Sequence, residues 1–122
     1  MKQSLTKQLG NAGEQLVADF LRNKGFAILA QNYRQRYGEV DLIAEKGDVI
    51  AFVEVKARTN PAFSALQSIT RSKQHKIFLA AKSFMVTHNV YNKVLRFDVA
   101  LVTVEACNTS IDYIENAFIP TY

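Results

Sequence analysis

Two carboxylates and a lysine near the middle of the chain have the types and spacing needed for metal-assisted phosphate chemistry. Glu54 and Lys56 interrupt an apolar run over 49–57, and Asp41 interrupts the preceding run over 39–44. Side chains two residues apart on a strand project from the same face, roughly 6.5 to 7 Å from each other. A buried charge is costly unless it is paired or bound to metal, and neighbouring carboxylates repel each other unless a cation lies between them.

A turn over 46–48 predicts that the two runs form a hairpin. Since Val40 and Leu42 would point to the opposite face, Asp41 would converge on Glu54 beside the lysine. Mg²⁺ prefers oxygen ligands, keeps several waters and is typically held by one or two carboxylates together with substrate phosphate. Such an ion polarises a phosphoryl oxygen and lowers the pKa of a bound water, which an adjacent lysine could orient or deprotonate.

The same residues also have structural interpretations, which stay open at this point. Asp41, Glu54 and Lys56 could form cross-strand salt bridges, or lie on a solvated face where the lysine guards an edge strand. Glu14 is a further candidate, because it flanks the apolar stripe of a predicted helix and could reach the carboxylates. Its structural alternative is a favourable charge in the first turn of that helix.

The elements that must position these residues are predicted from apolar periodicity and turn residues. The expected order is a helix over about 11–24, strands over 26–30, 39–44 and 49–57, a helix from 64 or 70 to 88, and strands over 96–104 and 111–119. Asn32–Gly38 is expected to be a basic, aromatic connection, and Asn108 and Thr109 are expected in a turn. The order α-β-β-β-α-β-(β) predicts an α/β fold in which helices flank a mixed β-sheet, and 122 residues fit one domain.

Composition and charge narrow the class of protein. Apolar residues make up 48% of the chain, which is enough for a core, and the net charge of +4 suits a polyanionic partner. Cys107 is the only cysteine, so the chain has neither an internal disulfide nor a cysteine-based zinc site. With no secretory signal and no apolar run of about 18 residues, a cytoplasmic location is expected. His75 and His88 have no partners at metal-ligand spacing, so neither predicts a zinc site.

Several motifs together resemble the bacterial YraN family. They are Gly13-Glu14 at the opening of a helix, Gly-Glu-Val-Asp-Leu-Ile over 38–43, Phe-Val-Glu-Val-Lys-Ala-Arg over 52–58, Lys73 before a helix, and Arg-Phe-Asp-Val over 96–99. That family belongs to the PD-(D/E)xK, or restriction-endonuclease-like, nuclease superfamily and is similar to archaeal Holliday-junction resolvases. The resemblance covers about residues 10–104 and implies an endonuclease-like domain.

Residue by residue, the resemblance assigns roles to the acidic cluster. Asp41 takes the place of the superfamily aspartate, and Glu54 and Lys56 take the place of its Glu-x-Lys pair. Glu14 matches the helix glutamate that resolvase-like members add to the metal site. Val40 departs from the pattern, because it stands where the superfamily's eponymous proline would be, although that proline is often missing in its members. The implied activity is Mg²⁺- or Mn²⁺-dependent cleavage of DNA, with Asp41, Glu54 and Glu14 at the metal.

Basic residues around the cluster suit nucleic-acid backbone contacts. The expected contact residues are Arg34, Arg36, Arg58, Arg71 and Lys73. Arg58 and Lys73 flank the acidic cluster, whereas each basic residue taken alone is more typical of a solvated surface. Arg96 and Asp98 share a strand face and are expected to form a structural ion pair. The resolvase analogy adds the expectation of a homodimer, because a symmetric junction has two strands to cut.

Two other interpretations of the function remain open. The first is a non-catalytic nucleic-acid-binding protein that keeps a nuclease fold and its charges. Metal-dependent cleavage that is lost on Glu54→Ala with binding retained would separate it from an enzyme. The second is a protein-interaction role in which the acidic cluster is only structural, and it predicts no salt-dependent affinity for DNA.

Overall fold

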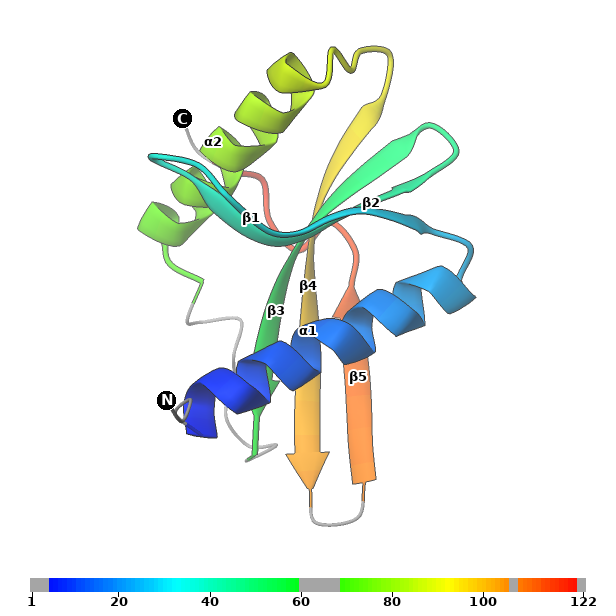
Figure 1. The fold of residues 1–122 in the computed structure, drawn as a ribbon, viewed down its shortest axis with the longest axis vertical. Helices are drawn as coiled ribbons and strands as arrows, with labels where there is room; N and C mark the ends of the chain where they lie inside the picture. The colour runs from blue at the N-terminus through cyan, green and yellow to red at the C-terminus, as the bar shows by residue number, and fades with distance from the viewer. Residues whose placement is uncertain (1–4, 60–68, 106–107, 121–122) are drawn as a thin grey trace.

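The structure is a computed structural model that describes residues 5–59, 69–105 and 108–120. These residues form one five-stranded mixed sheet with a helix on each face (Figure 1). The elements are α1 (Leu5–Asn23), β1 (Ala27–Arg34), β2 (Glu39–Lys46), β3 (Val49–Arg58), α2 (Arg71–Thr87), β4 (Val94–Glu105) and β5 (Asn108–Ile114). The expected order of elements and the mixed α/β class are therefore confirmed.

The strands lie side by side in the order of the sequence, with β3 at the centre of the sheet. Neighbouring strands are antiparallel except for β3 and β4, which are parallel because α2 connects them. Glu54 and Lys56 are both on β3, the central strand, and not on a strand at the edge of the sheet. They lie beyond Val53, however, where β3 has lost its partner β2 and pairs only with β4, so this part of the strand has one open side.

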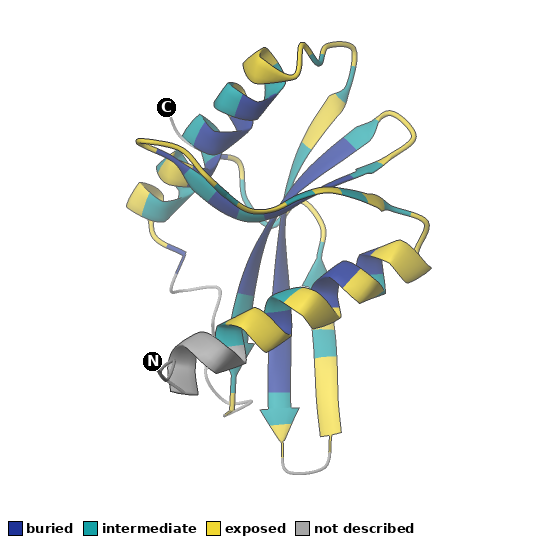
Figure 2. Cartoon of the chain, viewed as in Figure 1, coloured by how far each residue is buried: buried dark blue, intermediate teal, exposed yellow. Residues whose placement is uncertain are grey.

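Buried residues run along the central strands of the sheet and the inner sides of both helices (Figure 2), and apolar side chains form a core on each face of the sheet. The core between α1 and the sheet consists of Val17, Ala18, Leu21, Leu42, Ala44, Ala51, Val53, Val55, Ala100 and Val102. The core between α2 and the sheet consists of Val40, Ile43, Ile50, Phe52, Ile77, Ala80, Ala81 and Phe84. The alternation along β3 fits a strand that is covered on both sides, and it places Glu54 on the α2 side, in line with Phe52.

Several boundaries differ from those expected, because pairing between strands outweighs local residue preference. β1 continues to Arg34, whose partner in the ladder is Glu39, so Asn32–Arg34 are strand residues and not part of a connection. Asn108 and Thr109 pair with the end of β4 and belong to β5, so the turn expected there is wrong. β5 also ends at Ile114, five residues earlier than expected.

The helices begin at positions set by capping and by packing. α1 begins at Leu5, six residues before the expected start. Thr70 is the N-cap of α2, and its side chain accepts a hydrogen bond from the Lys73 backbone N–H at 3.2 Å, so the later of the two expected starts is confirmed. Position 64, the earlier start, and Cys107 lie outside the described residues. Neither helix has the length and apolar character needed to cross a lipid bilayer.

The connection between β1 and β2 packs directly on the backbone of α2. A Cβ atom at Gly38 would lie 2.5 Å from the Ala80 nitrogen and 2.7 Å from the Lys76 carbonyl oxygen. Those distances are far inside van der Waals contact, and the atoms that would be met belong to helix backbone. Only glycine fits there, so this loop and α2 are held against each other without an intervening side chain.

Candidate functional site

The candidate site lies where β2 separates from β3. The ladder between them ends at Leu42 and Val53, and beyond that point β3 pairs only with β4. The carboxylate of Asp41 occupies the opening, and its Oδ2 accepts a hydrogen bond from the Val55 backbone N–H at 2.8 Å. A side chain thus replaces the lost backbone partner, which anchors Asp41 beside the centre of β3.

Asp41 also marks a change of face in β2. Val40 packs on the α2 side and Leu42 on the α1 side, so the expectation that both point away from Asp41 to one face is wrong. Asn32, which falls opposite Asp41 in the β1–β2 register, has a positive φ of 50°. Left-handed backbone breaks regular alternation, and asparagine is among the few residues that adopt it readily. At this position Asp41 interacts both with Glu14 of α1 and with Glu54.

Glu54 is the most deeply buried acidic group of this site, with 3% of its surface exposed. Its Oε1 lies 2.9 Å from the Nζ of Lys73 on α2 and 4.0 Å from the Nζ of Lys56. These are not the cross-strand salt bridges expected as a structural alternative, because Lys56 lies on the same strand as Glu54 and Lys73 lies on a helix. Lys73 was expected only to contact the phosphate backbone of nucleic acid, but it is part of the acidic site.

The pKa of the Glu54 carboxyl is raised to about 7. Burial is the largest cause, the negative charge of Asp41 adds to it, and the ion pair with Lys73 opposes both. The pKa of Lys56 is lowered, first by burial and then by the neighbouring Lys73. Burial alone would lower the pKa of Lys73, but its contacts with Lys56, Glu54 and Asp41 outweigh that effect and raise it.

Glu14 approaches Asp41 from α1, on the opposite side of the sheet from Glu54. Its pKa is raised by burial and by the charge and hydrogen bonding of Asp41, while a hydrogen bond with the Asn32 side chain lowers it. Because α1 begins at Leu5, Glu14 lies in the middle of the helix, and the alternative of a first-turn charge is wrong. The three expected carboxylates thus meet around Asp41, which interacts with both others.

The donor set fits a hard divalent cation that keeps most of its water. Within the described residues, no group of three His, Cys, Asp or Glu side chains has the arrangement of a complete metal site. A protein that supplies only one or two carboxylates is typical for Mg²⁺, whereas a structural zinc ion needs four ligands. The mutual repulsion that helps raise the pKa of Glu54 is the kind of strain that a cation near Asp41 would relieve.

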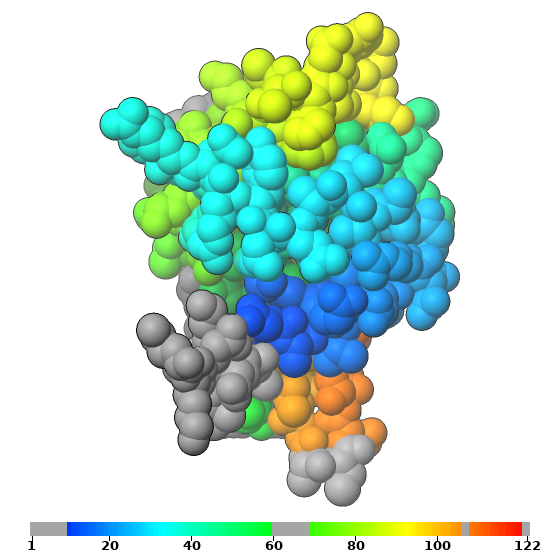
Figure 3. Space-filling model, viewed as in Figure 1, coloured from blue at the N-terminus to red at the C-terminus, as the bar shows by residue number. Residues whose placement is uncertain are grey.

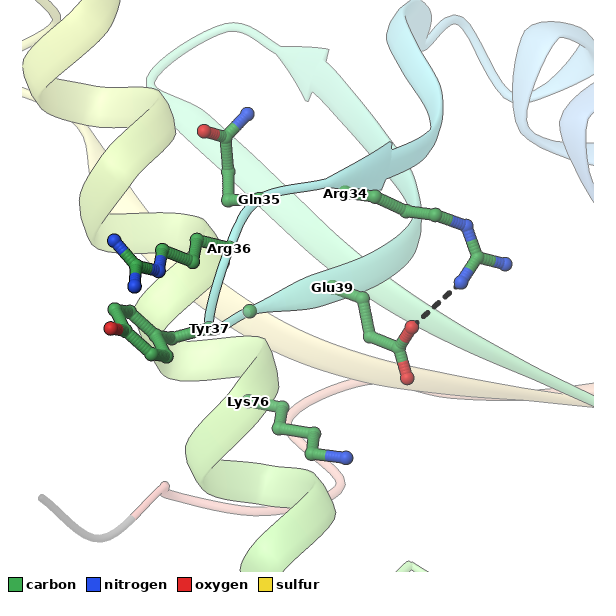
Figure 4. A pocket seen from close by; sticks show the side chains of 7 residues that line it. Arg34, Gln35, Arg36, Tyr37, Glu39 and Lys76 are labelled. Carbon is green, nitrogen blue, oxygen red and sulfur yellow. Dashed lines mark hydrogen bonds and ion pairs between the residues drawn. The ribbon is translucent and has the colours of Figure 1, made fainter.

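The basic residues expected to contact nucleic acid are only partly gathered at the site. Arg58, on the same strand as Glu54, donates from Nε to Thr103 Oγ1 at 2.9 Å. Arg71 is the first residue of α2, two residues before Lys73. Arg34 and Arg36 lie instead on and beyond the end of β1, where they line a hollow with Lys76 (Figure 4).

Asn32 is the positioning residue that sequence reasoning missed. Its backbone has a positive φ opposite Asp41, and its side chain forms a hydrogen bond with Glu14. Asn32 therefore lies next to two of the three carboxylates. The available signal was an asparagine inside a strand-like segment, since this residue type is enriched at positive φ. For Lys73 the signal was its place four residues before Ile77, on the buried side of α2.

The expected ion pair on β4 is confirmed as a structural cluster. The fully buried carboxylate of Asp98 accepts hydrogen bonds from Arg96 Nε at 3.1 Å, from the Tyr113 hydroxyl at 2.6 Å and from the Asn116 backbone N–H at 3.0 Å. Burial and the bond to Asp98 raise the pKa of Tyr113 far above its usual range. These contacts tie β5 and the segment after it to β4, away from Asp41.

Known proteins that resemble this chain over most of its length belong to one family. The family model described as Uncharacterised protein family UPF0102 matches residues 13–102, which include every residue of the acidic cluster. A UPF0102 protein of Alkaliphilus metalliredigens is 36% identical over 115 residues, covering 93% of this chain and all of the relative. A UPF0102 protein of Legionella pneumophila is 37% identical over 116 residues, covering 93% of this chain and 97% of the relative.

A third relative extends the agreement to another bacterial group. A UPF0102 protein of Chlorobium chlorochromatii is 42% identical over 120 residues, covering 93% of this chain and 92% of that protein. The matched lengths are close to the full lengths on both sides, so the likeness concerns the whole fold and not one motif. The chain belongs to the UPF0102 family.

Proposed function

We propose that this protein is a metal-dependent endonuclease of the restriction-endonuclease-like fold that hydrolyses DNA phosphodiester bonds, including those of branched DNA. One observation carries the proposal. Glu54, at 3% exposure on the central strand, is placed between the carboxylate of Asp41 and the ammonium groups of Lys56 and Lys73. Burying Glu54 beside a second carboxylate and two ammonium groups costs desolvation free energy, and a site for a metal ion and a phosphate accounts for that cost.

The chain's own residues divide the work that phosphodiester hydrolysis requires. Asp41 and Glu54 would hold Mg²⁺ or Mn²⁺, and Glu14 would act on the Asp41 side. The ion, when bound, supplies a Lewis acid for the phosphoryl oxygen and a water of lowered pKa. Lys56, whose own pKa is lowered, is suited to accept a proton from the attacking water. Lys73 is suited to hold Glu54 in place and to face charge growing on the phosphate.

A second candidate function is non-catalytic nucleic-acid binding, and one contact favours it. The Nζ of Lys73 lies 2.9 Å from Glu54 Oε1, so a cationic group already neutralises the carboxylate on which a metal would act. In a binding protein this pair would be permanent and the charges would serve only affinity and fold. In an enzyme, the same lysine would hold Glu54 in place and also face the phosphate of the substrate.

The test is a cleavage assay on branched, duplex and single-stranded DNA with Mg²⁺, Mn²⁺ or chelator. The variants are close in shape to the wild-type side chains, so that they disturb the folded structure as little as possible. They are Asp41→Asn, Glu54→Gln and Lys56→Met. The matched control is Asp19→Asn, which removes a carboxylate that is 57% exposed on α1 and contacts its helix neighbours Arg22 at 3.1 Å and Gln15 at 3.2 Å.

Cleavage that needs metal, survives in the control and falls at least about 100-fold in all three site variants would support the enzyme, since acid–base groups contribute roughly 10² to 10⁴. Salt-sensitive binding without cleavage in any metal would favour the binding function and sink the catalytic one. The proposal extends to a homodimer on branched DNA, which mass measurement of the protein–DNA complex would test.

A further inference from the structure

The connection between β1 and β2 separates two hollows on the surface. The first, of about 360 Å³, is lined by residues 34–39 and Lys76 (Figure 4). The second, of about 310 Å³, is lined by residues 35–38 together with Leu79 and Ser83 of α2. Both volumes are within the range of small-ligand sites, about 300–1,000 Å³. The same four-residue loop therefore has a charged hollow on one side and a more apolar hollow on the other.

This loop is held in a defined place although it projects from the body of the protein (Figure 3). Gly38 rests on the backbone of α2 so closely that no side chain would fit between them. Arg36 places its guanidinium carbon 5.1 Å from the centre of the Tyr37 ring, a cation–π contact that orients both groups. Tyr37 nevertheless keeps 68% of its surface exposed. An aromatic ring that is positioned but largely uncovered is prepared for a ligand.

A line of positive charge connects this loop with the acidic site. Lys73 and Lys76 are three residues apart on α2 and so share a face of that helix. Lys73 touches Glu54, and Lys76 lines the first hollow together with Arg36. Arg34 in the same hollow is ion-paired with Glu39 at 2.8 Å, and Arg36 turns towards the Tyr37 ring, so Lys76 is the cation of this hollow that is placed to meet an anion (Figure 4). A chain of phosphates leaving the acidic site would follow this line to the loop.

We propose that the β1–β2 loop binds an unpaired nucleotide of the DNA substrate. Its phosphate lies in the first hollow against Lys76, and its base lies in the second hollow between Tyr37 and Leu79. Aromatic side chains stack on any base, whereas a base within an intact duplex is stacked on its neighbours and cannot enter a pocket. The inference rests on the proposed nucleic-acid function and adds a preference for unpaired strands next to the scissile bond.

The test measures equilibrium binding in chelator, so that it does not depend on cleavage. Three fluorescent DNAs are compared: a paired duplex, the same duplex with one additional unpaired nucleotide, and a single strand. The variants are Tyr37→Leu and Tyr37→Phe, and thermal unfolding confirms that each remains folded. Lys76→Gln is paired with the control Lys82→Gln, which removes the same charge from an exposed position six residues along the same helix.

The wild-type protein should bind the two unpaired DNAs more tightly than the duplex. Tyr37→Leu should lose about 5- to 150-fold in affinity for them, as expected for one stacked base, whereas Tyr37→Phe should keep it. Lys76→Gln should reduce the slope of log affinity against log salt by about 0.7 on the single strand, and Lys82→Gln should leave the slope unchanged.

Equal affinity for all three DNAs, or a preference that survives Tyr37→Leu, would overturn the inference even if the wild-type protein cleaves DNA. Conversely, a preference that depends on Tyr37 in a protein that never cleaves would uphold the loop as a binding site and refute only the catalytic function. The two failures are therefore distinguishable.

Discussion

The ammonium group of Lys73 lies 2.9 Å from the carboxylate of Glu54, so the helix after the central strand neutralises the strand's buried acid. The two residues come from different layers of the fold, and α2 must pack against the sheet before they can meet. The contact links the packing of α2 to the electrostatics of the candidate site. Changes at either residue should therefore be visible in stability as well as in activity.

Lys73→Met should destabilise the protein by about 1–3 kcal/mol at pH 8, because a buried carboxylate loses its charged hydrogen-bond donor. At pH 5 the cost should be smaller, since Glu54 without Lys73 would be protonated more readily. Urea unfolding at the two pH values measures the difference. Lys82→Met, on the exposed side of the same helix, is the matched control, and an equal loss in both variants would contradict the assigned ion pair.

The pH dependence of stability should carry the signature of Glu54. Its pKa rises from 4.5 to about 7 on folding, so between these values the folded protein keeps a proton that the unfolded chain has released. Stability from this group is thus fully present below pH 4.5 and is lost as the pH rises through 7. A shift of about 2.5 units corresponds to about 3 kcal/mol.

Glu54→Gln cannot titrate and should remove this dependence. In chelator, its free energy of unfolding should gain about 3 kcal/mol relative to the wild-type protein between pH 4 and pH 8. Denaturant titrations of both proteins at several pH values provide the comparison. Parallel pH profiles for the two proteins would show that Glu54 ionises normally in the folded state.

Asn32 should act on both backbone and site. Asn32→Ala should cost about 1–2 kcal/mol, because alanine disfavours the left-handed backbone at φ 50°. Asn32→Gly tolerates that backbone and should be less destabilising, yet it also removes the hydrogen bond that lowers the pKa of Glu14. We expect Asn32→Gly to weaken metal-dependent activity with little loss of stability. An unfolding curve and a metal titration of each variant separate the two effects.

Substituting alanine for Gly38 and for Gly13 should change the stability of the protein in opposite directions. At Gly38 a Cβ would lie 2.5 Å from the Ala80 nitrogen, and overpacking of this kind costs about 1–3 kcal/mol. At Gly13, inside α1, the nearest atom would be the Ala57 Cβ at an ordinary 3.5 Å, so the better helix propensity of alanine should stabilise by up to about 1 kcal/mol. Chemical denaturation of the pair tests both signs in one experiment.

Much of the acidic site could be predicted from the sequence because its members sit on well-patterned strands. Glu54 and Lys56 interrupt an unambiguous apolar run, and the short turn before β3 makes the hairpin with β2 recognisable. Period-two alternation then places both residues on one face. The same reasoning found the pair of Arg96 and Asp98 on β4.

The remaining features depend on contacts that no local pattern encodes. Asp41 reaches the site because β2 is irregular opposite Asn32 and because its residues before Leu42 are not paired with β3. Regular alternation would have put Val40 and Leu42 on one face and Asp41 on the other. The position of Lys73 depends on how α2 packs against the far face of the sheet. The length of β1 and β5 follows from the strands beside them, which compete with the turn-forming preference of asparagine.

The parallel pairing of β3 with β4 also has a consequence for the order in which the molecule folds. The β2–β3 hairpin joins residues that are neighbours in sequence, so Asp41 and Glu54 can meet through a local search. Val49 and Val94 pair only after the whole crossover has been closed, and non-local pairing of this kind is slow. We therefore expect the nascent chain to bring the two acids together first and to gain the neutralising lysine only in a late kinetic phase.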